Sequence, residues 1–220
     1  MSAEMNSAAE DRSLAGWEIL SVVSSLLIAE WVILSFVGNS KLVAAVPVGL
    51  AFIFMCLSHR LRGETIREIG FRLDNFSQAV KWLLLPTLLA GTLIVLAGWV
   101  SGGLRFNLAP SRPRFLLLPL WALVQQYVTQ GFVNRRAQIW LGRGMPSVLI
   151  VAVVFSLLHL PNLPLAGATF LGSLLWAAGY QRVRNVFAPA LSHAFLSFLI
   201  AFCFPPSWLN SLRVGFKYFN

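Results

Sequence analysis

The sequence has few charged residues and very few acids. Only 11% of its 220 residues are charged, against about 25% in soluble domains, and the last of its eight acidic residues is Asp74. Residues 75–220 therefore hold no side-chain carboxylate, which excludes an Asp or Glu proton acceptor from that stretch. The two cysteines, Cys56 and Cys203, lie in separate apolar runs without metal-ligand spacing, so we expect buried thiols.

Apolar residues make up 57% of the chain, and the mean hydropathy is +0.73. A composition this apolar is that of a membrane protein and not of an ordinary soluble domain. The net charge of +9 comes from basic residues scattered between apolar runs, so they form no surface for nucleic acid. The composition predicts an all-α, polytopic helical bundle in the lipid bilayer, with no nucleic-acid partner.

Seven apolar runs could each form a membrane helix, because about 20 helical residues cross a hydrocarbon core of roughly 30 Å. They cover about residues 17–38, 42–58, 79–100, 115–136, 147–160, 165–180 and 186–204. An eighth span or a re-entrant segment is the alternative. Eleven of the 17 Lys and Arg lie in the N-terminal segment, in the connections after the second, fourth and sixth runs, or at the ends of the runs next to these connections, which predicts a cytoplasmic N-terminus.

The chain shows no internal repeat, which favours a single transmembrane domain over residues 17–205 with a motif-bearing core at about residues 114–204. Residues 1–16 are polar and predict a disordered tail, and residues 206–220 form a C-terminal tail. Between the second and third runs, the charged sequence HRLRGETIREIGFRLDNF predicts a short surface helix around Ile66.

Polar side chains stand in three of the later apolar runs. Gln125, Gln126 and Gln130 lie in the fourth run, His159 ends the fifth, and His193 lies in the seventh. Polar groups are costly in hydrocarbon and usually face a bundle interior or a wet cavity. We therefore expect these five residues to converge on one intramembrane site; histidines that are merely satisfied within the core are the alternative.

The order of these motifs resembles the CAAX-protease and bacteriocin-processing family, also called CPBP or Abi, of multi-pass intramembrane proteases. That family shows EExxxRG, then FxxxH, then HxxxN or HxxxD. This chain has QQYVTQG from Gln125, FSLLH ending at His159, and HAFLS from His193 to Ser197. The resemblance extends over roughly residues 67–204, and FSLLHLPN is its most specific element.

The resemblance implies roles for four positions: water activation at Gln125, assistance at His159, and stabilisation of the oxyanion at His193 and Ser197. The chain departs from the family because Gln125 and Gln126 replace both carboxylates, Gln130 replaces the arginine, and Ser197 replaces the asparagine. A neutral amide cannot take a proton from water near neutral pH. The catalytic carboxylates that the family uses are therefore absent from these positions.

Three mechanisms remain compatible with these residues. His159 could be the base, with His193 and the glutamines polarising the scissile carbonyl. Zinc held by His159 and His193 is an alternative, although catalytic zinc usually has three protein ligands. A nucleophilic Ser156 or Ser197 is another, but it lacks an orienting acid. The membrane span that holds Glu30 could bring the one carboxylate near this site, or Glu30 could simply bond to a neighbouring helix.

The first function hypothesis is an intramembrane endopeptidase of bacterial plasma membranes, cutting a membrane-embedded or lipid-anchored protein. The second is a pseudoprotease that keeps the cavity and binds a hydrophobic peptide, a lipid or a partner helix. A small transporter or channel would predict broken helices in matching halves, and the sequence shows no such symmetry.

Overall fold

The computed structural model describes residues 2–37, 41–104 and 116–219, and within these ranges the regular structure is entirely helical. The prediction of an all-α membrane bundle is thereby confirmed. In chain order the helices are α1 (Ser2–Leu27), the π-helical segment η1 (Ile28–Ile33), α2 (Leu34–Val37), α3 (Lys41–Leu61), α4 (Ile66–Ile69), α5 (Phe76–Val100), α7 (Leu118–Gln126), the π-helical segment η2 (Tyr127–Asn134), α8 (Arg135–Leu141), α9 (Met145–Leu157), α10 (Leu163–Arg182), α11 (Phe187–Cys203), and the 3-10 turns η3 (Asn210–Leu212) and η4 (Gly215–Phe219).

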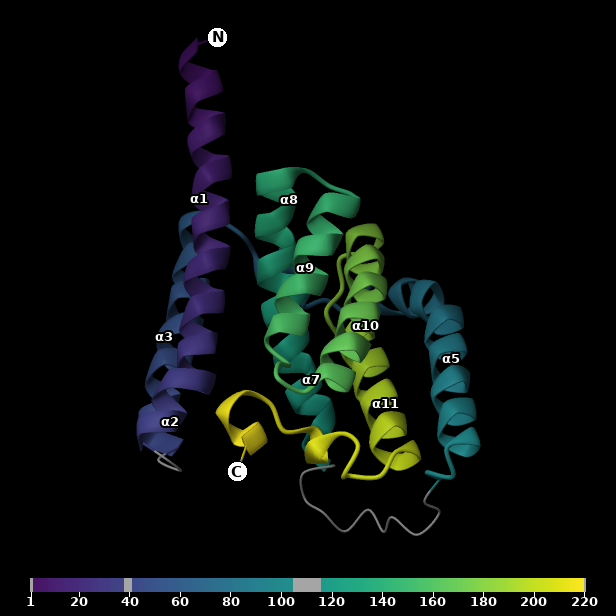
Figure 1. Ribbon diagram of the computed structural model, residues 1–220. Coiled ribbons are helices and arrows are strands. Elements are labelled where there is room, and N and C mark those ends of the chain that lie inside the picture. Colours follow the sequence, from purple (N-terminus) through teal and green to yellow (C-terminus); the bar gives the residue numbers. More distant parts are fainter. Residues whose placement is uncertain (1, 38–40, 105–115, 220) are drawn as a thin grey trace.

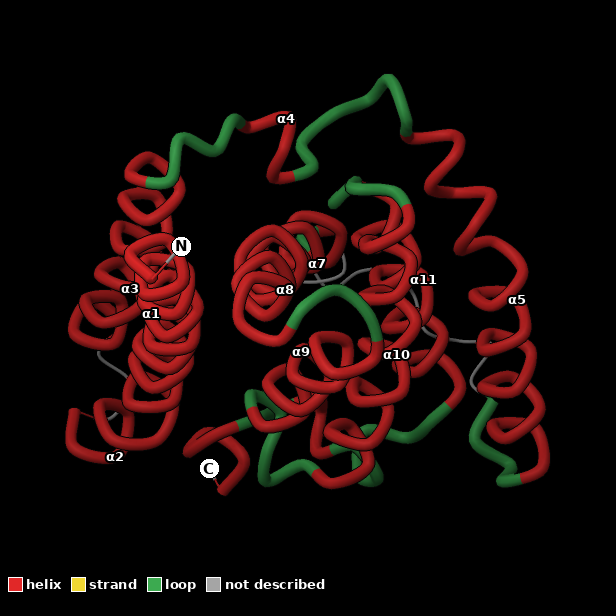
Figure 2. The backbone as a smooth tube through the Cα atoms, turned by 90° about the horizontal axis from the view of Figure 1, so that it is seen from above, coloured by secondary structure: helices red, strands yellow, loops and turns green. Residues whose placement is uncertain are grey.

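The helices lie in three groups (Figures 1 and 2). α1 and α3 pair at one side, α7 to α11 form the centre, and α5 covers α11 at the opposite side. Successive long helices alternate in direction, so the connections after α3, α8 and α10 lie at the same end as the N-terminus, while the C-terminus lies toward the other end. Most of the basic residues counted in the sequence are therefore at one end of the bundle.

Three helical stretches of the described chain are long and apolar enough to cross a membrane: Ala9–Phe36, Phe76–Val100 and Leu163–Arg182. Three shorter helices of the described chain are also apolar: Ala45–Leu61, Met145–Leu157 and Phe187–Cys203. The 13 residues of α9 rise only about 20 Å, less than the hydrocarbon core of roughly 30 Å. That the chain crosses the membrane seven times stays a prediction.

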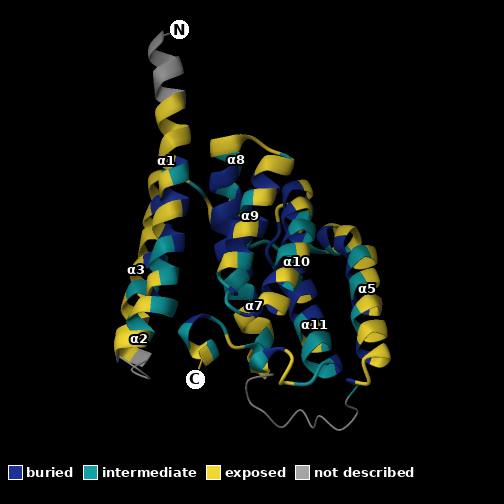
Figure 3. Cartoon of the chain, in the orientation of Figure 1, coloured by how far each residue is buried: buried dark blue, intermediate teal, exposed yellow. Residues whose placement is uncertain are grey.

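The outer helices expose apolar side chains, as expected for surfaces that face lipid. On α5 the exposed residues include Leu84, Leu85, Leu88, Leu89 and Leu93. Buried residues concentrate instead in the central helices (Figure 3). The exposed apolar faces indicate an integral membrane protein, because a soluble protein rarely exposes contiguous apolar surface of this extent.

Two expectations from the sequence are wrong. Residues 2–16 belong to α1 and are not disordered, because Ala, Glu and Met favour a helix and because Asp11 pairs with Arg62 at 2.5 Å. Cys203 is buried as predicted, but Cys56 is exposed, because α3 buries the face that carries Ala51 and Met55.

The predicted surface helix is confirmed as α4, and it docks the first half of the chain onto the second. Thr65 caps it in a capping box with Glu68, and Gly70 ends it with φ +108°. The carbonyl of Gly70 accepts a hydrogen bond from the Val186 amide at 3.0 Å. The Tyr180 hydroxyl donates to the carbonyl of Ile69 at 2.6 Å. These contacts hold the connection before α5 against the turn between α10 and α11.

A buried charge cluster joins α1, α3 and α8 at the N-terminal end of the bundle. The Arg136 side chain is fully buried; it contacts the Glu18 and Glu64 carboxylates, both at 2.9 Å, and donates to the Ser58 hydroxyl at 2.8 Å. Arg135 also binds Glu64. A buried guanidinium is tolerated only when it is paired in this way.

We expect Arg136→Ala to lower the free energy of unfolding by about 3–5 kcal/mol, because it removes a fully buried basic partner from two buried carboxylates. Arg67→Ala is the matched control, since Arg67 is largely exposed and pairs with exposed Asp74; its effect should stay within about 0.5 kcal/mol. Denaturant unfolding of the purified protein in detergent measures both. Equal effects of the two substitutions would contradict a structural role for the cluster.

The same cluster predicts acid sensitivity. Burial alone would raise the pKa of Glu64, but hydrogen bonds from His59, Arg136 and Arg135 lower it well below its usual value. A carboxyl with a lowered pKa contributes stability above its unfolded pKa of about 4.3 and loses that contribution as the pH falls. We therefore expect the melting temperature to fall below about pH 5, and Glu64→Gln to flatten that fall. If the melting temperature of Glu64→Gln fell with decreasing pH as steeply as that of the wild type, Glu64 would not be the group responsible.

Candidate active site

A cavity of about 1330 Å³ lies at the centre of the molecule, between the α1–α3 pair and the central helices. Its lining is mainly apolar. The polar and ionisable lining residues are Glu30, Gln125, Thr129, His159, Thr169, His193, Ser197 and Ser211. A mainly apolar cavity with a few polar groups facing one another is the usual form of a ligand site.

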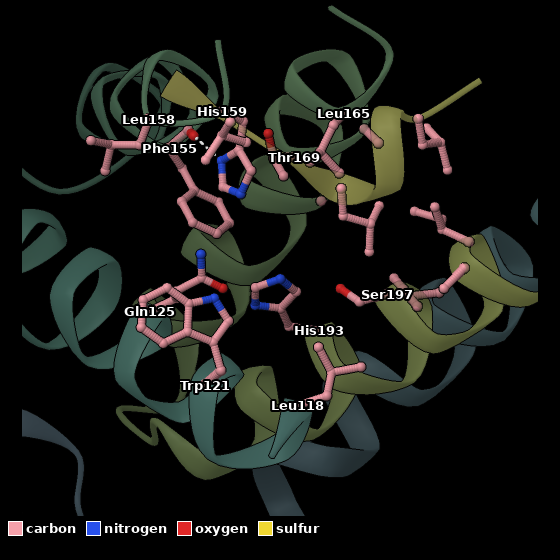
Figure 4. A pocket seen from close by; sticks show the side chains of 18 of the residues that line it. Leu118, Trp121, Gln125, Phe155, Leu158, His159, Leu165, Thr169, His193 and Ser197 are labelled. Atoms are coloured by element: carbon pink, nitrogen blue, oxygen red, sulfur yellow. Dashed lines mark hydrogen bonds between the residues drawn. The ribbon is translucent and has the colours of Figure 1, made fainter. Parts of the chain in front are cut away.

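Four of the predicted site residues reach this cavity. Gln125 comes from α7, His159 from the end of α9, and His193 and Ser197 from α11. Figure 4 shows their side chains around a shared space, with Trp121 and Phe155 beside them. Segments far apart in the sequence therefore bring both histidines, one glutamine and the serine together.

His159 is held by its own helix. Its Nδ1 lies 2.7 Å from the carbonyl oxygen of Phe155, one turn earlier (Figure 4). A carbonyl only accepts hydrogen bonds, so Nδ1 carries the proton and the lone pair of the neutral ring is on Nε2. The Phe155 ring packs edge-on against His159 at a centroid distance of 4.7 Å. His159 is thus oriented with a free proton acceptor.

The contacts of His193 favour the opposite tautomer. The amide nitrogen of Gln126 lies 3.4 Å from its Nδ1. Because an amide nitrogen donates, this Nδ1 accepts and the ring proton is on Nε2. The rings of Trp176 and Phe155 hold the imidazole at centroid distances of 4.6 and 5.5 Å. One neutral histidine therefore offers a proton acceptor and the other offers an N–H donor.

The three glutamines have different surroundings. Gln125 lines the cavity, whereas Gln126 and Gln130 are fully buried and lie off its lining. Gln126 lies behind His193, and Gln130 accepts a hydrogen bond from the Asn134 amide at 2.9 Å. Asn134 in turn accepts from Gln181 on α10 at 3.0 Å. The π-helical segment η2 starts directly after Gln126, and such turns change which side chains share a face.

The two candidate serines also differ. Ser156 donates to the carbonyl of Ala166 at 2.9 Å, so it joins α9 to α10, and it lies off the cavity lining. Ser197 does line the cavity. Only the Ser197 hydroxyl is therefore placed to act on a molecule bound there.

Two ionisable residues outside the sequence motifs, Glu30 and His59, lie in different surroundings. Glu30, on η1, is the acidic residue of the described lining, and its buried Oε2 has no hydrogen-bond partner among the described residues. His59 was overlooked in the sequence; it lies outside the cavity, with its Nδ1 2.5 Å from Glu64. Its position at the start of the charged segment after the second apolar run could have indicated that it pairs with a charged residue. His59 therefore belongs to the charge cluster and not to the site.

The residues that could hold a metal are few. In residues 2–37, 41–104 and 116–219, no three His, Cys, Asp or Glu side chains form a group that could hold a metal ion. The zinc hypothesis rests on His159 and His193 alone, one ligand short of the usual catalytic set.

Comparison with known proteins adds one match. A protein-family model described as "Type II CAAX prenyl endopeptidase Rce1-like" matches residues 113–199. No curated protein and no solved structure matches the chain. The matched stretch contains Gln125, Gln126, His159, His193 and Ser197. The family resemblance found in the sequence is confirmed over residues 113–199, which carry every motif of the candidate site and match the Rce1-like CAAX endopeptidase model.

Proposed function

We propose that the chain is an intramembrane endopeptidase that hydrolyses a peptide bond of a membrane-embedded or lipid-anchored protein. The observation that carries this proposal is that both histidines line one cavity with different partners at Nδ1. The partner of His159 is a carbonyl oxygen, which leaves Nε2 as the proton acceptor, and the partner of His193 is an amide nitrogen, which leaves Nε2 as the donor. Peptide hydrolysis needs a proton acceptor for water and a donor for the developing oxyanion. The family match supports the same reaction class.

In the proposed mechanism, His159 Nε2 takes a proton from water while the water oxygen attacks the scissile carbonyl carbon. The carbonyl oxygen becomes an oxyanion that accepts a hydrogen bond from His193 Nε2, assisted by the Gln125 amide and the Ser197 hydroxyl. When the carbon–nitrogen bond breaks, the imidazolium of His159 returns its proton to the leaving amine. Gln126 acts through His193, because it fixes the tautomer of that ring.

The cavity supports a substrate with a large apolar part. Its walls carry Leu93, Ile94, Leu171, Leu175 and Ile200, and its volume of about 1330 Å³ exceeds that of a typical ligand pocket, roughly 300–1,000 Å³. A lipid chain and a short peptide fit together within such a space. Prenylated peptides are one such substrate class; peptides with another lipid, or with a membrane-spanning segment, are others.

We also propose a bacterial plasma membrane as the location, with the N-terminus in the cytoplasm. The orientation is supported by the basic residues at one end of the bundle, where Arg62, Arg135 and Arg136 lie in the charge cluster close to the N-terminal half of α1. Cytoplasmic ends of membrane helices carry such an excess of Lys and Arg.

A second candidate function is a pseudoprotease that binds a hydrophobic peptide or partner helix without cutting it. The observation in its favour is that amides occupy the two positions where the family has carboxylates, and that one of them, Gln126, is fully buried against His193. A cavity that has lost its carboxylates still binds apolar ligands.

The two functions are separated by His159→Ala. We expect cleavage to fall by roughly a hundredfold or more, because the substitution removes the proton acceptor. Membrane-protein termini are compared by mass spectrometry in cells that express matched amounts of wild type, His159→Ala or no protein. The control is Ser156→Ala on the same helix, whose hydroxyl faces α10; it should leave the termini as in the wild type. If wild type and His159→Ala yield the same termini, the peptidase is ruled out and the binding function takes its place.

The positions of the two glutamines generate a further prediction. Gln125→Glu should increase cleavage about tenfold or more, because a carboxylate there adds a proton acceptor that faces the cavity. Gln126→Glu is the matched control: its carboxylate would be buried behind His193, so it should lower stability without increasing the rate. Rates of peptide hydrolysis in detergent micelles measure both. If Gln126→Glu increased the rate of hydrolysis and Gln125→Glu did not, position 126, and not 125, would face the substrate.

A further inference from the structure

The C-terminal segment closes one side of the cavity. The lining includes six of its residues: Pro206, Trp208, Leu209, Ser211, Leu212 and Val214. The segment follows α11 and runs past the ends of the central helices that lie away from the N-terminus, and its last turn, η4, lies near α2 (Figure 1). The C-terminal segment thus forms part of the wall of the cavity that both histidines also line.

The segment is held mainly through its backbone. The Asn162 amide donates to the carbonyl of Leu209 at 2.7 Å and to that of Arg213 at 3.2 Å. The Gly215 amide donates to the carbonyl of Leu160 at 2.8 Å. Hydrogen bonds to peptide groups do not depend on side-chain identity, so a different peptide in the same conformation can make all three.

Gly215 lies directly against the first membrane helix. Its φ is +56°, and a Cβ added there would be 2.9 Å from Glu30 Cβ and 3.0 Å from the Glu30 carbonyl oxygen. Lys217, two residues later, belongs to η4, which packs against the η1 segment that carries Glu30. The acidic residue of the described cavity lining and a basic residue of the C-terminal segment therefore lie on neighbouring turns.

The segment also has an unfavourable local conformation. Asn210, Ser211 and Leu212 have φ values of +44°, +54° and +61°, a left-handed region that residues other than glycine occupy at a cost. The Asn210 amide stabilises this turn by donating to the carbonyl of Tyr218 at 2.5 Å. Strained backbone persists only where the surroundings hold it, and it gathers at ligand-binding and switch regions.

We propose that residues 206–219 are an internal peptide ligand of this cavity, and that Asn162, the Leu160 carbonyl and Glu30 form a subsite for peptides that carry a basic side chain. Asn162 and Leu160 bind the peptide backbone, and Glu30 binds the Lys or Arg. The C-terminal segment occupies the subsite until another peptide displaces it. That this other peptide is the substrate rests on the proposed peptidase function; occupation of the subsite by the C-terminal segment does not.

The first test measures release of the segment. A reporter thiol is introduced as Leu209→Cys, at a buried position, in full-length protein that also carries Cys56→Ser and Cys203→Ser. Its reaction rate with a water-soluble maleimide is followed in lipid nanodiscs. Gly215→Ala should accelerate labelling roughly tenfold, since a left-handed alanine and a contact with Glu30 both disfavour the held state. Gly167→Ala, where an added Cβ meets nothing within 4 Å, should leave the rate unchanged.

The second test asks whether the vacated subsite binds a peptide in trans. A synthetic peptide of residues 206–220 with a photoreactive group is cross-linked to the Gly215→Ala protein, where it should label several-fold more than in the wild type. Adding Asn162→Asp should abolish the gain: aspartate can still accept from the Leu165 amide at the start of α10, but it cannot donate to the peptide carbonyls. Replacing the lysine of the peptide by glutamate should weaken labelling in the same way.

Either of two results would overturn the proposal. Equal maleimide rates for Gly215→Ala and Gly167→Ala would show that the segment is not held through this contact. Faster release without any peptide cross-linking would show that the segment only fills space. If Gly215→Ala does not fold, Lys217→Glu replaces it in both tests, because it opposes Glu30 without altering the backbone. Neither measurement requires cleavage, so a failure of this proposal can be distinguished from a failure of the peptidase proposal.

Discussion

A polar side chain inside this apolar bundle is costly unless another group of the chain bonds to it, since neither lipid nor the apolar core supplies a partner. That constraint explains the two arrangements on which the molecule depends. Arg136 is buried only because Glu18, Glu64 and Ser58 surround it, and this pairing joins α8 to α1 and α3. The histidines are satisfied in the same manner, by a carbonyl and an amide, and those bonds also decide which ring nitrogen carries a proton.

Because amides replace the carboxylates at positions 125 and 126, the chemistry of the site depends on the two neutral histidine rings. With an acid beside it, a histidine would be drawn toward the charged form, whereas beside neutral amides it stays neutral and acts through its lone pair or its N–H. The Gln126 amide suits this role because it can donate to His193 without bringing a charge into the core. The substitution of Gln for Glu is thus chemically consistent with a site that works through two neutral rings.

Much of the fold could be predicted from composition and periodicity, because apolar runs in hydrocarbon have little alternative to helices. The meeting of His159 and His193 also followed from the cost of burying each alone. The separate surroundings of Gln125, Gln126 and Gln130 could not be read in the same way, because adjacent residues of a helix point in different directions and the packing of α7 against its neighbours decides which of them faces the cavity. The helical N-terminus was missed because its partner, Arg62, is distant in sequence.

The two ends of the chain supply what its middle lacks. Residues 75–220 contain no acid, yet the cavity built largely from them has a carboxylate, because α1 continues through η1 and places Glu30 on its wall. The C-terminal segment then packs η4, which carries Lys217, against η1, and the carbonyl of Leu209 accepts a hydrogen bond from Asn162. A charge that a core sequence has lost can therefore be supplied by a flanking helix. The chemistry of such a cavity then depends on contacts between the chain's ends that no local motif encodes.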